Sequence, residues 1–309
     1  MRRGSTSGSK LSFSAIAALS TKGGLSLAQA AEAQDARRPA ASRQTTAVSM
    51  PSAVCPRRMP KPLRFPPSCV CLRSALVERR SWFIDELKHA GAEHLDTRYV
   101  HGYDRKARFD PTADLAILRD LGLGPASTLV DLGAGTGELS LAAAEVCQRV
   151  VAVDVSAAML DVVRAKALQR HATRLEVVCA GFLSYEHAGE QADFVYTRNA
   201  LHHLPDFWKA IALRRVARLL RPGGSLILRD LIFSFEPEES ERVVEAWIKA
   251  APIRPESGWT RSELETHLRD EHSTFTWLIE PMLERAGFEI QSATSDDSKV
   301  FAAYTCVRR

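Results

Sequence analysis

The sequence predicts an α/β fold built on a doubly wound, mostly parallel β-sheet. Short runs rich in Val, Leu and Ile alternate with longer segments of helical periodicity. The short runs are continuously apolar, which is typical of strands that are covered by helices on both faces. The chain has 309 residues, of which 45% are hydrophobic and 25% charged, as in an ordinary globular protein.

The elements are expected in a fixed order from residue 76 onward. An amphipathic helix is predicted over residues 76–96, and a second helix begins after Asp110, which caps it, with Pro111 at the first helical position. Five buried strands follow: "STLVDLG", "RVVAVDV", "LEVVCA", "ADFVYTR" and "GSLILRDLI". Between them lie the predicted helices "LSLAAAEVC", "SAAMLDVVRAKALQ" and "DFWKAIALRRVARLL".

Residues 1–75 differ from the rest in composition. They are rich in Ser, Ala, Arg and Pro, and they carry 12 Lys and Arg against only Glu32 and Asp35. We expect a disordered basic extension. The alternatives are an organelle transit peptide and a translation start nearer Met59. The expected location is the cytoplasm, or a mitochondrion or plastid if the extension is a transit peptide.

Charge and hydropathy disfavour two classes of partner. Residues 76–309 hold 29 basic and 35 acidic residues, a net charge of −6, whereas the whole chain carries +4. A domain that binds nucleic acid needs clustered positive charge, so no nucleic-acid partner is expected. The sequence has no apolar run of about 18 residues, so no membrane span is expected either.

The cysteines do not predict a metal centre. None follows a metal-ligand spacing, and the one close pair, Cys69 and Cys71, has no histidine partner. Cys147 and Cys179 fall in apolar patterns and are expected to be buried thiols. His267, Asp270 and His272 also lack a recognised ligand spacing, and we predict no metal site.

The stretch "LVDLGAGTGELS", residues 129–140, joins the first predicted strand to a helix. In a doubly wound sheet, ligands bind beyond the carboxyl ends of the strands, next to the first strand. The spacing here is G-x-G-x-G rather than the dinucleotide pattern G-x-G-x-x-G, and Asp131 and Glu138 flank it. Two carboxylates would repel a diphosphate, which disfavours a nicotinamide-dependent oxidoreductase and favours a ligand that carries positive charge.

The second predicted strand ends with Asp154, 23 residues after Asp131. An acid at this point can accept hydrogen bonds from both hydroxyls of a ribose. A nucleoside with a cationic side arm fits both acids, and S-adenosylmethionine is such a molecule.

Residues 129–235 resemble the class I S-adenosylmethionine-dependent methyltransferases. The matching segments are "LVDLGAGTG", "VVAVDVSAAML", "DFVYTRNALHHLPD" and "LLRPGGSLILRD", in the order and at the separations of that family. The resemblance implies a seven-stranded sheet whose last two strands are "GFEIQSATSD" and "VFAAYTCVR". It is closest to the small-molecule branch that includes the quinone and sterol methyltransferases.

The resemblance also implies which residues hold S-adenosylmethionine. The glycine turn would pass under the methionine portion, Asp131 would receive its ammonium group directly or through water, Asp154 would hold the ribose, and Val155 would lie against adenine. The family often has an acidic residue at the end of the third strand, where this sequence has Gly181 and Phe182. The implied cofactor residues are Asp131, Gly133, Ala134, Gly135, Gly137, Asp154, Val155, Gly181, Phe182, Arg198 and Asn199.

Three residues are candidates for catalysis. His203, after the fourth strand, is a candidate general base, although packing of its loop explains a histidine there about as well. Tyr103 lies in the polar and aromatic front segment, residues 94–110, which could cover the cofactor as a lid. His272 lies in the helical insertion predicted over residues 236–274, which follows the cofactor-binding core, residues 127–235, and precedes the final helix and strands, residues 275–309.

Two other functions stay open at this stage. A nucleic-acid methyltransferase is disfavoured because "TRNALHH" stands where amino-methylating DNA enzymes have an Asn-Pro-Pro-Tyr type segment. A non-catalytic binding protein with the same fold is disfavoured by the intact glycines and Asp154. A small-molecule acceptor is expected, but neither the methylated atom, whether O, N or C, nor the oligomeric state can be derived from the sequence.

Overall fold

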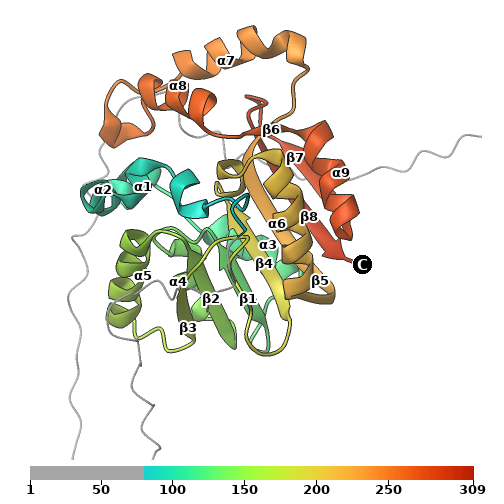
Figure 1. Cartoon of the computed structure of the whole chain (residues 1–309). Helices are drawn as coiled ribbons and strands as arrows, with labels where there is room; N and C mark the ends of the chain where they lie inside the picture. The colour runs from blue at the N-terminus through green and yellow to red at the C-terminus, as the bar shows by residue number, and fades with distance from the viewer. Residues whose placement is uncertain (1–79) are drawn as a thin grey trace, which may run out of the picture. The chain divides into compact units, whose positions relative to one another are not determined.

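A computed structural model of the chain describes residues 80–309 (Figure 1). The predictions for residues 1–75 lie outside this range. Eight strands form one sheet, in the order β3-β2-β1-β4-β5-β8-β7, with β6 paired to β5 off this path. The strands are β1 Thr128–Leu132, β2 Arg149–Asp154, β3 Leu175–Cys179, β4 Ala192–Arg198, β5 Leu220–Phe233, β6 Thr274–Phe275, β7 Phe288–Ser295 and β8 Phe301–Arg308.

The helices are, with η for the 3₁₀ type, η1 Glu86–His89, α1 Ala92–Leu95, α2 Thr97–Ala107, α3 Thr112–Asp120, α4 Glu138–Ala144, α5 Ala157–Gln169, η2 Leu201–His203, α6 Asp206–Leu219, η3 Pro237–Glu239, α7 Ser240–Lys249, η4 Pro255–Ser257, α8 Arg261–Asp270 and α9 Thr276–Ala286.

The predicted doubly wound fold is confirmed. Strands β3, β2, β1, β4 and β5 pair in parallel, and β8 pairs antiparallel with both β5 and β7. Strand order reverses at β1, so right-handed crossovers place the helices of the two halves on opposite faces. Helix α4 contacts α3 and α5, whereas α6 packs beside α9 (Figure 1).

The core forms because the predicted apolar runs are buried from both sides. Leu129 and Val130 of β1 and Val150 to Val153 of β2 are fully or almost fully buried. The helices begin where short polar residues offer caps: the Ser156 side chain accepts a hydrogen bond from the Met159 backbone at the start of α5. The Asp110 side chain accepts from the Thr112 backbone before α3, but Pro111 is the N-cap of α3 and not, as the sequence predicts, its first helical residue.

One predicted element is wrong. The sequence predicts a continuous helix over residues 76–96, but within the described part this segment forms two short helices, η1 and α1. The break falls at Gly91, whose φ of 76° lies in the left-handed region. The Glu86 side chain is buried and accepts a hydrogen bond from the Leu183 backbone at 2.9 Å, so a tertiary contact replaces helical continuity.

Helices α1 and α2 and the insertion helices α7 and α8 lie beyond the same edge of the sheet, where the parallel strands end (Figure 1). The Lys106 ammonium connects the front helices with the insertion helices. It forms an ion pair with Glu263 of α8 and lies 5.1 Å from the Tyr99 ring centre and 5.7 Å from that of Trp259. The front segment and the insertion are therefore packed against each other, as one cap.

No helix in residues 80–309 is long and apolar enough to cross a membrane.

Candidate functional site

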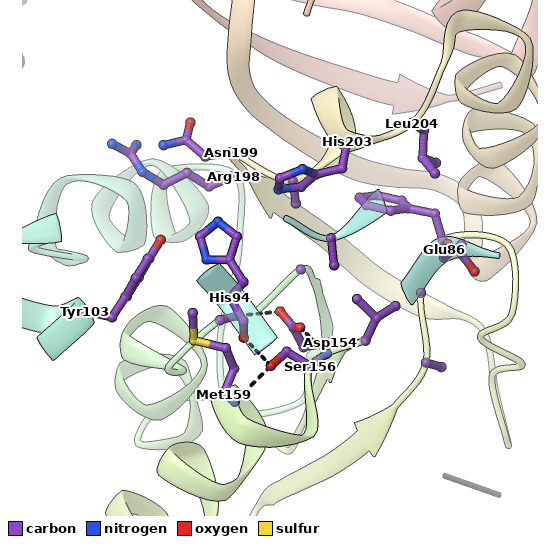
Figure 2. A pocket seen from close by; sticks show the side chains of 18 residues that line it. Glu86, His94, Tyr103, Asp154, Ser156, Met159, Arg198, Asn199, His203 and Leu204 are labelled. Atoms are coloured by element: carbon purple, nitrogen blue, oxygen red, sulfur yellow. Dashed lines mark hydrogen bonds between the residues drawn. The ribbon is translucent and has the colours of Figure 1, made fainter. Parts of the chain in front are cut away.

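A pocket opens at the carboxyl ends of the parallel strands, under the front segment (Figure 2). The space within it is about 690 Å³, part of it continuous with solvent. It is lined by Glu86, Ala90, His94, Tyr103, Gly133, Gly135, Asp154, Val155, Ser156, Met159, Ala180, Gly181, Phe182, Arg198, Asn199, Ala200, His203 and Leu204. This is the place that the strand order predicts for a ligand.

The three glycines of the turn after β1 are required for different reasons, although all have positive φ. A Cβ atom on Gly133 would lie 2.3 Å from the Cβ of Ala200, so the neighbouring loop excludes a side chain there. A Cβ on Gly137 would lie 2.9 Å from the Val163 side chain, inside the protein. A Cβ on Gly135 would meet nothing within 4 Å, because this glycine faces the pocket.

Asp154 holds the glycine turn in place. One carboxylate oxygen accepts a hydrogen bond from the Gly135 backbone at 2.8 Å, and the other accepts one from the Ser156 backbone at 2.8 Å. Each oxygen keeps a further acceptor position that can serve a ligand. Burial raises the pKa of Asp154 above its usual range, although both backbone hydrogen bonds oppose this shift.

Asp131 lies below the pocket and does not line it. Its side chain is 3% exposed and accepts a hydrogen bond from the Ser140 hydroxyl at 2.6 Å. Burial raises the pKa of Asp131 to about 7. Of the two contacts expected between Asp131 and a ligand's ammonium group, the structure therefore favours the one through water over the direct one. Ala134 and Gly137 do not line the pocket either.

The end of β3 carries an acid that the sequence pattern did not reveal. Glu86, from η1, lies against Gly181, where a Cβ atom would be 2.3 Å from the Glu86 carboxylate. Its second oxygen accepts a hydrogen bond from the Ser184 hydroxyl at 2.9 Å. The glycine therefore makes room for a carboxylate from a segment almost a hundred residues away, and Phe182 and Val155 complete this end of the pocket.

The end of β4 supplies two polar residues. Arg198 lies 3.5 Å from the Asp114 carboxylate and stacks on Phe109, 4.7 Å from the ring centre. Asn199 has a left-handed φ of 48°, and its backbone donates to the Arg229 carbonyl at 2.8 Å. Both residues line the pocket, and their contact with a ligand's polar end stays a prediction.

The front segment closes the pocket from above. His94 and Tyr103 line it, with ring centres 5.7 Å apart (Figure 2). The Ser156 hydroxyl donates to the His94 carbonyl at 2.7 Å, which ties α1 to the start of α5. Asp104, one residue beyond Tyr103, accepts from the Thr136 hydroxyl and forms an ion pair with Lys166 at 2.6 Å. The front segment is thus anchored directly to the glycine turn.

His203 lines the pocket and forms its boundary with a polar cluster. Its Nδ1 atom is buried and has no hydrogen-bond partner. Burial and the neighbouring His202 hold the pKa of His203 well below its usual range, so the ring is neutral at physiological pH. A neutral imidazole can accept a proton, which is compatible with the predicted general base.

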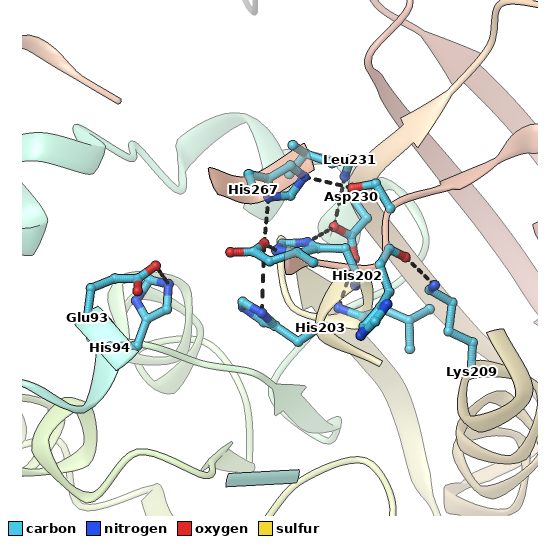
Figure 3. Close-up of polar contacts among 12 residues, drawn as sticks. Glu93, His94, His202, His203, Lys209, Asp230, Leu231 and His267 are labelled. Atoms are coloured by element: carbon cyan, nitrogen blue, oxygen red, sulfur yellow. Dashed lines mark hydrogen bonds and ion pairs between the residues drawn. The ribbon is translucent and has the colours of Figure 1, made fainter. Parts of the chain in front are cut away.

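Next to His203 lies a cluster of His202, Asp230 and His267 (Figure 3), which Glu271 joins through its contacts with both histidines. The Nδ1 atom of His202 donates to Asp230 at 2.5 Å, and its Nε2 lies 3.0 Å from Glu271. The Nδ1 atom of His267 lies 2.5 Å from the same Glu271 oxygen. Although burial acts in the opposite direction, the two carboxylates raise the pKa of His202 to about 9.

His272 does not reach the pocket. Its ring lies 5.8 Å from that of His89, and its backbone carbonyl accepts from the Lys209 ammonium. Its backbone N–H donates to the His202 carbonyl at 2.9 Å, so it helps to hold the insertion against the loop after β4. The catalytic role that the sequence suggested for His272 is untested, and its position outside the pocket disfavours that role.

Sequence reasoning missed Glu86, His94, Ser156 and Met159 as pocket residues and Glu271 as a partner of His202. Ser156 and Met159 lie two and five residues after Asp154, so proximity to that strand end could have indicated them. Glu86 and Glu271 carry no such signal, because they reach the site from separate elements.

The comparisons with known proteins agree with this geometry. A family described as a methyltransferase domain matches residues 129–224. An uncharacterized methyltransferase of Geobacillus kaustophilus is 30% identical over 155 residues, which cover 50% of this chain and 70% of that protein. The 27-O-demethylrifamycin SV methyltransferase of Amycolatopsis mediterranei is 30% identical over 200 residues, covering 61% of this chain and 69% of that protein.

A solved structure with a similar chain path is magnesium protoporphyrin IX methyltransferase from Synechocystis with bound S-adenosylmethionine, at a TM-score of 0.46 and 18% identity, covering 74% of this chain and 100% of that one. The family match and the two relatives carry the assignment that the glycine turn and Asp154 predict. The chain belongs to the class I S-adenosylmethionine-dependent methyltransferases, and its cofactor is S-adenosylmethionine.

Proposed function

We propose that this enzyme transfers the methyl group of S-adenosylmethionine to a small-molecule acceptor in the pocket under the front segment. The observation that carries the proposal is the pocket itself, which the front segment covers in part. Two acids, Asp154 and Glu86, line it together with His94, Tyr103 and His203. A cap held by the Lys106 ion pair suits a compact acceptor better than a polymer.

The cofactor would lie across the strand ends. Asp154 would accept from the ribose hydroxyls through the acceptor positions that its two backbone partners leave open. The Glu86 carboxylate, above Gly181, would accept from the adenine amino group, in place of the acid that the end of β3 lacks. Gly135 would let the backbone approach the methionine portion, whose carboxylate would face Arg198.

The protein's part in the reaction is positioning and exclusion of water. A sulfonium methyl group is already electrophilic, so an acceptor needs alignment with the S–CH₃ bond more than activation. Where the acceptor atom carries a proton, His203 is the neutral imidazole at the pocket wall that can remove it. Tyr103, with its pKa raised by burial to about 12, stays protonated and can donate a hydrogen bond.

Two observations favour a small molecule over a nucleic acid. Residues 76–309 carry a net charge of −6, which opposes binding to phosphate backbones. The relative from Amycolatopsis mediterranei is a 27-O-demethylrifamycin SV methyltransferase, and by its name it methylates a small molecule.

The test is transfer of a labelled methyl group. The full chain is incubated with methyl-labelled S-adenosylmethionine and a metabolite extract, and labelled products are separated by mass. We expect label in a product of low molecular mass, and the His203→Ala variant should form it at least tenfold more slowly. Label found only in added RNA or DNA would replace the proposal by a nucleic-acid acceptor. Cofactor binding without any labelled product would favour a non-catalytic binding protein.

A further inference from the structure

The cluster behind His203 brings together three imidazoles around one carboxylate (Figure 3). The Glu271 Oε2 atom lies 3.0 Å from His202 Nε2, 2.5 Å from His267 Nδ1 and 3.9 Å from His203 Nδ1. We propose that His202, His267 and Glu271 bind one divalent transition-metal ion, preferentially Zn²⁺. This site is separate from the cofactor pocket, and it does not depend on the identity of the methyl acceptor.

The spacing of the ligand atoms suits a metal ion. The one ligand atom that each of His202, His267 and Glu271 offers lies within 4.8 Å of the other two. In a tetrahedral zinc site with bonds of about 2.0–2.2 Å, ligand atoms are about 3.3–3.5 Å apart. The distances from Glu271 to the two histidine ligands, 3.0 and 2.5 Å, are both shorter than this value, so the side chains would rotate slightly apart to admit the ion. Two imidazoles and one carboxylate form a ligand set that zinc prefers.

The atoms behind the ligands are arranged as in metal sites. Asp230 accepts from the outer nitrogen of His202, and three backbone N–H groups, those of Leu201, His202 and Leu231, hold the carboxylate at 2.8–3.1 Å. The outer nitrogen of His267 is bonded to the Ser273 hydroxyl at 2.8 Å. A carboxylate or hydroxyl behind a histidine fixes the tautomer and aims the inner nitrogen at the metal.

Charge balance also favours a cation. Asp230 is 2% exposed and the Glu271 side chain 16% exposed. Within residues 80–309, all ion-pair partners of these two acids are histidines, and neither Lys nor Arg pairs with them. With the His202 imidazole protonated, the two poorly solvated carboxylates still leave a charge of −1, and a divalent ion that displaced this proton would neutralise both of them.

His203 provides an independent indication that a ligand is missing. Its Nδ1 atom is buried and has no hydrogen-bond partner, yet it points to the same Glu271 oxygen. A metal ion at the cluster, directly or through a bound water, would supply that partner. Because His203 also lines the cofactor pocket, the ion would join the insertion, which carries His267 and Glu271, to the wall of the pocket.

The first experiment measures metal binding by the full chain. Protein treated with a chelator is titrated with Zn²⁺ by calorimetry, and metal content is measured after desalting. We expect one Zn²⁺ per chain, at least 100-fold weaker binding in His267→Gln and Glu271→Gln, and no change in His187→Gln. His187 is a matched control, since its ring is hydrogen-bonded outside the cluster, to Tyr185 and the Glu190 carbonyl.

The possible results distinguish a zinc site from a hydrogen-bonded network without metal. No zinc binding, or binding that all three variants retain equally, would show that the cluster is a hydrogen-bonded network of charged imidazoles. X-ray absorption on zinc-loaded wild-type protein covers the case in which a cluster variant fails to fold. Imidazole scattering from at least two histidines is expected, and a zinc environment without it would overturn the proposal. Neither measurement uses methyl transfer, so failure of the proposed acceptor class would leave both results interpretable.

Discussion

The cofactor base and the histidine cluster are built in opposite ways. The cofactor base, formed by the glycine turn and Asp154, comes from two neighbouring parallel strands and the residues that immediately follow them. The histidine cluster, formed by His202, Asp230, His267 and Glu271, comes from a short helix after β4, from β5 and from the insertion. The first region depends on local backbone geometry, and the second depends on how separate elements pack.

Function can vary more readily in the cap of this fold than in its glycine turn. A turn between a buried strand and a helix has few solutions, so its residues are constrained by the backbone. Side chains of the cap can be substituted without altering the sheet. The cap is therefore suited to determine which acceptor binds. The predictions that follow test whether the two regions are as separable as this difference indicates.

The largest effect is expected at Asp154. Asp154→Ala removes the acceptor of the Gly135 and Ser156 backbone hydrogen bonds and the proposed ribose contact. Charge-assisted hydrogen bonds of this kind contribute about 1.5–3 kcal/mol, so the Kd for S-adenosylmethionine should rise about 10- to 100-fold, measured by calorimetry. Asp161→Ala, which removes an exposed acid paired with Arg164 on α5, is the control. An unchanged Kd in Asp154→Ala would show that Asp154 does not contribute to cofactor binding.

The glycine turn allows a comparison within one loop. Gly133→Ala places a Cβ 2.3 Å from the Ala200 Cβ, whereas Gly135→Ala meets open space. Overpacking costs about 1–3 kcal/mol, so Gly133→Ala should lower the free energy of unfolding by at least that amount beyond Gly135→Ala. Gly135→Ala should mainly weaken cofactor binding.

Thermal unfolding and calorimetry distinguish these outcomes. Gly122→Ala is the control for a left-handed glycine, because it also meets nothing within 4 Å and lies outside the pocket. Equal stability of the Gly133 and Gly135 variants would show that the loop around Ala200 yields to the new side chain.

Asp131 gives a pH dependence with a definite sign. Its pKa is raised by burial to about 7, above the value of about 3.9 expected in the unfolded chain, so the folded state disfavours ionisation. Its contribution to stability is full below about pH 4 and is lost as the pH rises through about 7. Asp131→Asn should therefore reduce the fall in unfolding free energy across this interval, measured by urea unfolding without cofactor. An unchanged pH profile would mean that Asp131 ionises freely in the fold.

Tyr103→Phe tests the cap where it meets the cofactor base. Tyr103 is partly buried and lines the pocket, and loss of one hydrogen bond from its hydroxyl to a ligand would cost about 0.5–1.5 kcal/mol. Turnover should fall about 2- to 10-fold while thermal stability stays within about 1 °C, since the ring contacts with His94 and Trp259 are kept. Tyr99→Phe is the matched control, because Tyr99 does not line the pocket. Equal effects of the two variants would assign Tyr103 to packing.

The smallest effect is expected at His272. The ring does not line the pocket, and its contacts with the loop after β4 are made by its backbone. We expect His272→Ala to change the Kd for S-adenosylmethionine and the KM for the acceptor less than about twofold. A KM that rises tenfold with an unchanged kcat would place His272 in the acceptor site after all and extend that site beyond the pocket.

The elements that could be predicted have local causes. The order of strands β1 to β5 along the chain follows from continuous apolar runs. Ser156 caps α5, and Asp110 accepts from the Thr112 backbone just before α3, through contacts two or three residues away. The front helix could not be predicted, although its apolar spacing was helical. The Glu86 side chain instead accepts hydrogen bonds from Leu183 and Ser184, shortly after β3. The residues around Glu86 in the sequence do not indicate this tertiary contact.

The amino-acid sequence by itself determined the sheet, the cofactor and the positions of Asp154 and the glycine turn. The reason is that the backbone geometry and the charge of a G-x-G-x-G turn between two acids depend on neighbouring residues alone. The tertiary structure alone decided that Glu86 would fill the space above Gly181, that Asp131 would lie below the pocket, and that Glu271 would meet His202. These contacts join residues about 70 to 100 positions apart, and their distances depend on how the cap packs onto the finished sheet. Chain spacing cannot specify such contacts, since loops of many lengths bring the same two side chains together.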